Sequence, residues 1–218
     1  MVAKKGEDDY AWIKYPQHHN WFNKLWIAEQ FGYKCGPAGT DIPEDGVYVI
    51  RPIYNLSGMG LGAHVKELKA DDCTTPPGYF WCEYFNGLHY SANYEWKWDR
   101  DSINGKWEGT SCWEGTNFPI NLTRFEEWKK IDYIPKLPTS FDTLSDVGEI
   151  NVEFIDDKII EVHLRKSPDP DYQHMIPLWK SDYPEKKDHY LMHGYKYVEA
   201  YDDADKHLKD PRLGFLVK

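Results

Sequence analysis

The sequence feature that most constrains the fold is the apolar stretch "EINVEFIDDKIIEVHLR", residues 149–165. Apolar, often β-branched residues occur on both sides of Asp156-Asp157, a dipeptide of the kind found in tight turns. In a strand, successive side chains point to opposite faces. We therefore predict two short antiparallel strands joined by this turn. The apolar residues of the stretch are Val152, Phe154, Ile155, Ile159, Ile160 and Val162.

Two acidic residues, Glu153 and Glu161, lie one on each of these predicted strands. With the turn centred on 156–157, both carboxylates project from the same face, whereas a register slip of one residue would separate them. Two carboxylates aimed at one point suit Mg²⁺, which prefers a few hard oxygen ligands together with water and nucleotide phosphates. The alternative is a pair of solvent-facing glutamates on an exposed edge.

A glycine-rich segment, "VYVIRPIYNLSGMGLGAHVKEL", spans residues 47–68. Gly58, Gly60 and Ala63 satisfy the G-x-G-x-x-A dinucleotide fingerprint. That fingerprint requires a helix directly after the loop, and here Pro76 and Pro77 follow too soon to leave room for one. We predict instead two antiparallel strands joined by the loop.

Such a strand-loop-strand unit resembles a glycine-rich flap whose backbone amides cover a triphosphate, with Arg51 as the cation on the preceding strand. The alternative is a plain hairpin without a ligand. Protein kinases use a similar flap, but the sequence contains no HRD or DFG counterpart downstream, so we exclude a kinase.

Other segments show helical or extended patterns. "NWFNKLWIAEQFG" has apolar residues at helical spacing, with Asn20 as N-cap and Gly32 after the last turn. We also expect helices over Leu122–Ile131, Thr139–Leu144 and Asp203–Lys209, and a final strand in "RLGFLVK".

Composition limits the partners. The formal net charge is −10, which argues against nucleic acid or anionic membranes as ligands. Met1–Asp9 has no apolar signal region, and no run approaches the roughly 18 apolar residues of a membrane span, so we expect a cytoplasmic protein. The four cysteines show no metal-ligand spacing.

Taken in order, these segments resemble the ATP-grasp superfamily over about residues 20–165. The first helix offers Lys24, and a strand with a basic residue then leads into a glycine-rich loop. The segment "WCEYFNGLHYSANYEW" is similar to the hinge strand of the family and its continuation. The segment "INVEFIDDKIIEVHLR" is similar to the acidic strand pair of the family. The resemblance implies an α+β, ATP-grasp-like fold in which two small antiparallel-sheet lobes with flanking helices enclose a nucleotide cleft. We expect one unit over 1–218, with 166–218 as an extension that completes it.

The resemblance also implies roles for particular residues. Lys24 and Arg51 would neutralise the ATP phosphates, and the amides of Ser57, Gly58, Gly60 and Gly62 would cover them. Glu83, Tyr84 and Phe85 would line adenine, with His89 at the ribose position. Glu153, Glu161 and His163 would hold one or two Mg²⁺. Arg165 would orient a carboxylate or acylphosphate, so that Arg51 and Arg165 are the expected catalytic residues.

The sequence departs from the family pattern in four ways. Arg51 replaces the usual lysine, as in a divergent branch known from phages and from an initiation-factor assembly chaperone. His89 stands in place of the ribose-binding glutamate. His163 stands in place of a metal-binding asparagine, and imidazole suits softer ions than Mg²⁺. Little sequence precedes Lys24, so we expect no N-terminal substrate domain.

Three functions remain open. The first is an ATP-dependent ligase that joins a carboxylate to an amine through an acylphosphate, with a peptide or protein as a candidate substrate. The second is an ATP-binding assembly chaperone that docks through the Trp-rich hairpin 91–114. The third is a non-enzymatic aromatic-rich binding module. The sequence names neither substrate nor oligomeric state, and a phage-encoded protein would act in the host cytoplasm.

Overall fold

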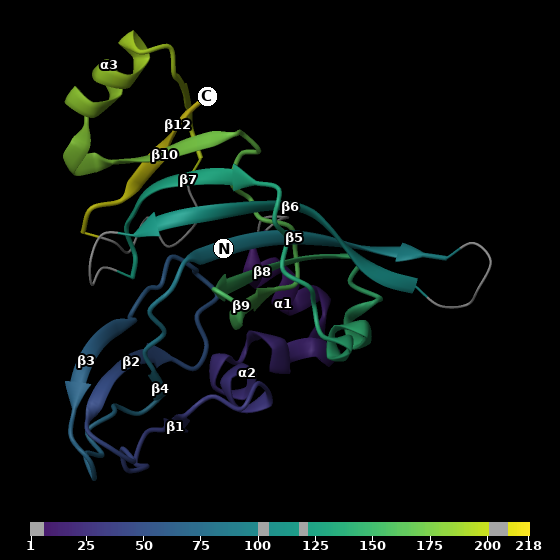
Figure 1. Ribbon diagram of the computed structural model, residues 1–218, viewed down its shortest axis with the longest axis vertical. Helices are drawn as coiled ribbons and strands as arrows, with labels where there is room; N and C mark the ends of the chain where they lie inside the picture. Colours follow the sequence, from purple (N-terminus) through teal and green to yellow (C-terminus); the bar gives the residue numbers. More distant parts are fainter. Residues whose placement is uncertain (1–6, 100–104, 118–121, 201–208) are drawn as a thin grey trace.

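The computed structural model describes residues 7–99, 105–117, 122–200 and 209–218, and these form two antiparallel sheets (Figure 1). The small sheet has the strand order β1-β4-β2-β3. Its strands are β1 (Cys35–Pro37), β2 (Gly46–Pro52), β3 (His64–Leu68) and β4 (Tyr79–Glu83). The glycine-rich segment therefore joins two paired antiparallel strands, β2 and β3, as predicted.

The large sheet has the order β11-β12-β10-β7-β6-β5-β8-β9. Its strands are β5 (His89–Trp98), β6 (Gly105–Asn117), β7 (Phe125–Ile131), β8 (Glu149–Ile155), β9 (Lys158–His163), β10 (His174–Trp179), β11 (Lys196–Val198) and β12 (Arg212–Val217). The predicted hairpin in 149–165 is β8 and β9, and the predicted final strand is β12. The paired strands β5 and β6 extend beyond the rest of the sheet (Figure 1).

Short helices accompany the sheets. They are α1 (Asp8–Lys14), the 3-10 helix η1 (Pro16–Phe22), α2 (Lys24–Gln30), the 3-10 helices η2 (Thr139–Leu144) and η3 (Lys180–Asp182), and α3 (Glu185–Met192). Among the residues that the structure describes, no helix is long and apolar enough to cross a membrane.

The main core lies on one face of the large sheet. Ile150, Val152 and Phe154 of β8 are almost fully buried and join a cluster with residues of α1, η1, α2 and η2. Because side chains alternate along a strand, Asn151 and Glu153 face the other way, toward the small sheet. The packing of the helices on one face therefore fixes which β8 residues reach the opposite face.

The predicted helix over Leu122–Ile131 is wrong, because Phe125–Ile131 is strand β7. The register of β6 and β7 shifts between Thr116 and Asn117, where two steps along β7 match one along β6. Such a bulge brings two residues three positions apart, Phe125 and Trp128, onto the same face, with ring centroids 4.3 Å apart. A bulged strand thus reproduced the three-residue spacing that favours a helix.

The predicted helix that begins at Asn20 is two separate helices. The chain turns at Asn23, which caps α2 by accepting a 2.9 Å hydrogen bond from the Trp26 amide. The predicted helix at Thr139–Leu144 is the 3-10 helix η2. The helix expected over Asp203–Lys209 lies, but for its last residue, outside the described residues.

A substitution in the core tests how β8 is held. Phe154→Ala is expected to lower the free energy of unfolding by roughly 3–5 kcal/mol, because it leaves a cavity beneath the strand that carries Glu153. Urea denaturation followed by circular dichroism measures this. The control is Ile13→Ala, at a side chain 71% exposed, with an expected change within about 0.5 kcal/mol. Equal midpoints for the two variants would contradict the packing described here.

Candidate functional site

A cleft lies between the two sheets, and most of the residues singled out in the sequence line it. These are Lys24, Arg51, Gly58, Gly60, Glu83, Tyr84, Phe85, His89, Glu153, Glu161, His163 and Arg165. Ser57 and Gly62 belong to the same loop but are absent from the described lining. The roles of all these residues stay predictions; the structure supplies their positions.

The two predicted acidic residues lie side by side. Glu153 of β8 pairs in register with Glu161 of β9, so both side chains project from the same face. His163, two positions along β9, shares that face, and one ligand atom from each of the three residues lies within 4.8 Å of the other two. Asp156 adopts φ 53° in the connecting turn, a conformation that Asp tolerates better than most residues. The alternative of solvent-facing glutamates is therefore wrong.

Two cations neutralise Glu161. Lys24 of α2 forms an ion pair with Glu161 Oε1, and Arg51 Nη2 of β2 lies 3.1 Å from Glu161 Oε2. The Lys24 side chain is only 5% exposed, so Lys24 does not lie on a solvated helix face. Burial lowers the pKa of Lys24, against the attraction of Glu161. Positive charge from two different elements is thus concentrated beside the acidic pair.

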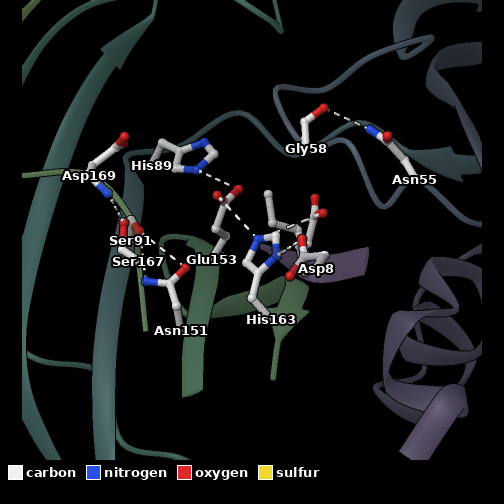
Figure 2. Close-up of polar contacts among 12 residues, drawn as sticks. Asp8, Asn55, Gly58, His89, Ser91, Asn151, Glu153, His163, Ser167 and Asp169 are labelled. Atoms are coloured by element: carbon white, nitrogen blue, oxygen red, sulfur yellow. Dashed lines mark hydrogen bonds and ion pairs between the residues drawn. The ribbon is translucent and has the colours of Figure 1, made fainter. Parts of the chain in front are cut away.

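His163 connects the acidic pair to a residue that sequence reasoning missed, Asp8 of α1. His163 Nδ1 lies 2.7 Å from Asp8 Oδ2, while Nε2 lies 3.7 Å from Glu153 and 3.8 Å from Glu161 (Figure 2). Arg165 Nε lies 2.9 Å from Asp8 Oδ1. Asp8 therefore holds both His163 and Arg165 from behind the cleft.

The pKa values follow from these contacts. Burial alone would lower the pKa of His163, but the Asp8 carboxylate outweighs it and raises the pKa to about 9. Burial would raise the pKa of Asp8, but His163 and Arg165 outweigh it and lower the pKa to about 2. Burial also opposes ionisation of Glu153, yet the adjacent imidazoles of His163 and His89 hold its pKa well below the usual range. The cluster is therefore a set of compensated charges.

His89 approaches Glu153 from the other side. Its Nε2 lies 3.3 Å from Glu153 Oε2, and Figure 2 shows both imidazoles directed at this carboxylate. Its ring makes edge contacts with Phe125 and Trp128, at centroid distances of 4.9 and 5.6 Å. His89 therefore lies between the acidic pair and a group of aromatic rings.

The glycine-rich loop reaches across the cleft. Gly58, Met59 and Gly60 all have positive φ, of 67°, 54° and 59°. A Cβ atom on Gly60 would lie 2.7 Å from the carbonyl oxygen of Leu122, which precedes β7 of the large sheet. Asn55 braces the loop by donating a 2.9 Å hydrogen bond to the Gly58 carbonyl (Figure 2). The close approach of the two backbones requires glycine at position 60.

The segment that links β4 to β5 lies where the two sheets meet. Glu83 donates its amide to the Lys34 carbonyl and accepts the Lys34 amide with its side chain, at 2.8 Å each. Phe85 packs against Tyr33, with ring centroids 4.9 Å apart. These contacts give the predicted adenine wall a fixed, partly aromatic surface.

Asn151 is a second residue that the sequence analysis did not identify. Its amide donates to Ser91 Oγ at 3.0 Å and to Asn93 Oδ1 at 3.1 Å, and Asn93 Oδ1 also accepts the Ser167 amide at 2.9 Å. This network holds β5, β8 and the chain after β9 together beneath the cleft. Asn151 lies two residues before Glu153, and because side chains alternate along a strand, this spacing predicts that Asn151 shares the face of Glu153.

Comparison with solved structures gives the fold. N5-carboxyaminoimidazole synthetase from Staphylococcus aureus is similar with a TM-score of 0.50 and 8% identity, over 90% of this chain and 66% of that one. An ATP-grasp superfamily protein from Archaeoglobus fulgidus (TM-score 0.41, 12% identity, 68% and 47% coverage) and L-amino acid ligase from Bacillus licheniformis (0.39, 16%, 67% and 41%) are less similar. This chain thus spans about two fifths to two thirds of the length of these proteins. No family model and no curated protein matches the sequence.

The predicted fold class is confirmed. The chain is α+β, with two antiparallel sheets, flanking helices and a cleft between them, and its fold is similar to that of N5-carboxyaminoimidazole synthetase. At this level of identity the comparison concerns the fold alone.

Removing the Asp8 charge tests the buried contacts behind the cleft. Asp8→Asn leaves Arg165 and protonated His163 without their anion, so we expect a loss of roughly 3–5 kcal/mol in the free energy of unfolding at pH 6. Urea denaturation in the presence of a metal chelator measures it. The control is Asp9→Asn, in the same helix but outside the cluster.

The same experiment has an expected pH dependence. Folding raises the His163 pKa from 6.5 to about 9, so protonated His163 stabilises the fold fully below about pH 6.5. This contribution declines as the pH rises toward 9. Asp8→Asn should reduce the decline, and a variant with the slope of the wild type would show that Asp8 does not set the His163 charge.

Proposed function

We propose that the protein is an ATP-dependent ligase that joins a carboxylate to an amine through an acylphosphate. One observation supports this most strongly: Lys24 and Arg51, from separate elements, converge on Glu161 beside Glu153, in a cleft that a glycine-rich loop spans. Phosphoryl transfer needs positioning and charge neutralisation more than covalent help from the protein, and this cluster offers both.

The residues present fit a divalent cation. Glu153, Glu161 and His163 bring two carboxylates and one imidazole within 4.8 Å, and carboxylate oxygens are the donors that Mg²⁺ prefers. A bound Mg²⁺ would neutralise charge on the transferred phosphoryl group. His163 directs Nε2 at the carboxylates while Asp8 takes Nδ1, so a cation would bind at Nε2 as the proton of that nitrogen leaves to solvent.

The other residues of the site would bind and orient the two reactants. Lys24 and Arg51 would hold the ATP phosphates, with the amides of the loop 57–62 above them. Glu83, Tyr84 and Phe85 would line the adenine, with His89 near the ribose. Arg165, fixed by Asp8, would orient the carboxylate.

The proposed chemistry has two displacements. In the first, a carboxylate oxygen attacks the γ-phosphorus of ATP, an O–P bond forms, and the bond to the β,γ-bridging oxygen breaks to release ADP. In the second, an amine attacks the acyl carbon, a C–N bond forms, and the C–O bond to phosphate breaks. Inorganic phosphate leaves, and the amine nitrogen gives up a proton to solvent.

The ion pairs of the cluster imply that nucleotide and cation bind together. Lys24 and Arg51 are engaged with Glu161, and both would turn to phosphate oxygens when ATP binds. Glu161 would then be released for the divalent cation. Each ligand thus removes a competing contact of the other, which is a positive coupling.

Thermal unfolding tests the binding. At a ligand concentration about 100 times the dissociation constant, Mg-ATP should raise Tm by roughly 5–10 °C, because binding stabilises the native state by about 2.7 kcal/mol. Glu161→Gln should abolish this rise. Glu149→Gln, at an exposed position of the neighbouring strand β8, is the control and should retain it. The absence of any rise with millimolar Mg-ATP in the wild type would refute nucleotide binding and favour the aromatic binding module.

Trapping the acylphosphate tests the ligation. With Mg-ATP, a mixture of amino acids and hydroxylamine, the wild type should release ADP and form hydroxamate in equal amounts, since hydroxylamine replaces the amine. Glu161→Gln should give neither product. A protein that binds Mg-ATP but yields no ADP under these conditions would be an ATP-binding assembly factor instead.

A further inference from the structure

The cleft continues past the acidic cluster along the face of the large sheet. Beyond His89 its lining is mainly aromatic and apolar, and we call this part the aromatic compartment. It consists of Trp113, Phe125, Trp128, Met175, Trp179 and Arg212. These residues come from β6, β7, β10 and β12, so the C-terminal strands supply about half of the compartment.

Strand register places the compartment on the same face as the acidic pair. His89 pairs with Gly115, Gly115 with Trp128, and Trp128 with Met175, in one row across four strands. Residues that pair directly in an antiparallel sheet share a face. The row therefore runs from the His89 that contacts Glu153 to the apolar residues of β10.

Gly115 makes room for the rings in this row. A Cβ atom at position 115 would lie 2.7 Å from the Trp128 ring and 2.8 Å from the Phe125 ring, both closer than carbon atoms approach. The two rings therefore lie over the bare backbone of β6 and lean toward His89. Their centroids are 5.6 and 4.9 Å from the imidazole, which in turn is 3.3 Å from Glu153.

The apolar cluster to which the rings of the compartment belong is covered differently from the main core. The main core is closed by α1, η1, α2 and η2, whereas the described members of the cluster that contains Trp113, Trp128 and Met175 include no helical residue. The rings line the cleft instead. Phe125 is only half-buried, so part of its face is available to a ligand.

The wall of the compartment that β12 supplies carries a compensated charge. The Arg212 guanidinium lies over the Phe215 ring at 4.6 Å, and its Nη1 is 3.2 Å from Asp169. Because Asp169 neutralises Arg212, this wall offers little net charge to a ligand. The compartment thus suits an uncharged body, with the charged end of the ligand lying toward the acidic pair, where Arg165 and a bound cation would hold it.

We propose that the aromatic compartment binds the body of the carboxylate substrate, and that this substrate is a carboxylic acid bearing an aromatic ring or a comparably large apolar group. An amino acid or a peptide end with such a side chain has this chemistry. Stacking on Phe125 and Trp128 places the carboxylate beyond His89, beside Glu153, where Arg165 and a bound cation would hold it. The inference rests on the proposed function for the fate of that carboxylate, but not for the binding itself.

Calorimetric titration with two matched probes tests the proposal. 3-Phenylpropanoate and propanoate carry the same charge and differ by one ring. Each is titrated into the wild-type protein, once without nucleotide and once with Mg²⁺ and a non-hydrolysable ATP analogue. We expect 3-phenylpropanoate to bind at least ten-fold tighter than propanoate in both conditions, because only its ring is removed from water in the compartment.

Variants locate the binding. Phe125→Ala should weaken 3-phenylpropanoate binding about ten-fold and leave binding of the ATP analogue unchanged, while Phe125→Leu keeps an apolar side chain for folding and should have a smaller effect. Trp98→Ala removes an aromatic residue that is 64% exposed on the distant end of β5, and should change neither affinity. Circular dichroism confirms that each variant is folded.

The outcomes separate this proposal from the proposed function. Binding of the ATP analogue with equal affinities for the two probes would overturn the aromatic compartment and leave the ligase intact. If 3-phenylpropanoate binds tightly and depends on Phe125 while the ATP analogue does not bind, the result would support the compartment and refute the ligase. Equal loss of 3-phenylpropanoate affinity in Trp98→Ala and Phe125→Ala would also overturn the compartment.

Discussion

The ion pairs of Glu161 with Lys24 and Arg51 join three elements of the chain. Glu161 belongs to β9 of the large sheet, Arg51 to β2 of the small sheet, and Lys24 to α2. The Lys24 amide donates to the Ile53 carbonyl at 2.9 Å, which ties α2 to the end of β2. A buried cation needs an anion nearby, because the interior cannot replace its hydration. The same ion pairs therefore set both the position of the small sheet over the large sheet and the charge balance of the cleft.

The same constraint balances the charges of the site. Buried ion pairs often add little net stability, because desolvation cancels much of the attraction, yet removing one partner is costly. Here Asp8 compensates His163 and Arg165 behind the cleft, while Glu161 compensates Lys24 and Arg51 within it. A ligand would exchange partners among charges that are already desolvated. Its affinity would then depend on the difference between two sets of contacts, not on the full strength of either.

The sequence predicted those features that depend on local pattern. The β8–β9 hairpin follows from its turn and its alternation, and the pairing of Glu153 with Glu161 follows from the hairpin. Strand β7 was missed because a bulge imitates helical spacing at Phe125 and Trp128. In a single short segment, the spacing of apolar residues cannot distinguish a helix from a strand when a β-bulge falls inside the segment.

Non-local contacts were beyond sequence reasoning. Asp8 is 155 positions from His163, and nothing in the segment around it indicates that α1 lies behind β9. The sequence left open whether Arg212 returns to the cleft or only completes the final strand; it lines the cleft because β12 pairs with β10, which in turn pairs with β7. Both placements depend on how distant segments pack together, which a single sequence does not specify. The residues predicted best were those whose partners lie within the same hairpin.

Gly115 has a consequence for how binding selectivity could change over evolution. It lies beneath the Phe125 and Trp128 rings, and its missing side chain sets how deep those rings sit in the sheet. A larger residue there would lift both rings into the open space above them without altering any residue that a ligand touches. The size of the ligand that the cleft admits would then depend on position 115, which does not itself contact the ligand. In proteins of this architecture, ligand selectivity could therefore diverge through substitution at position 115, while the residues that line the cleft stay unchanged.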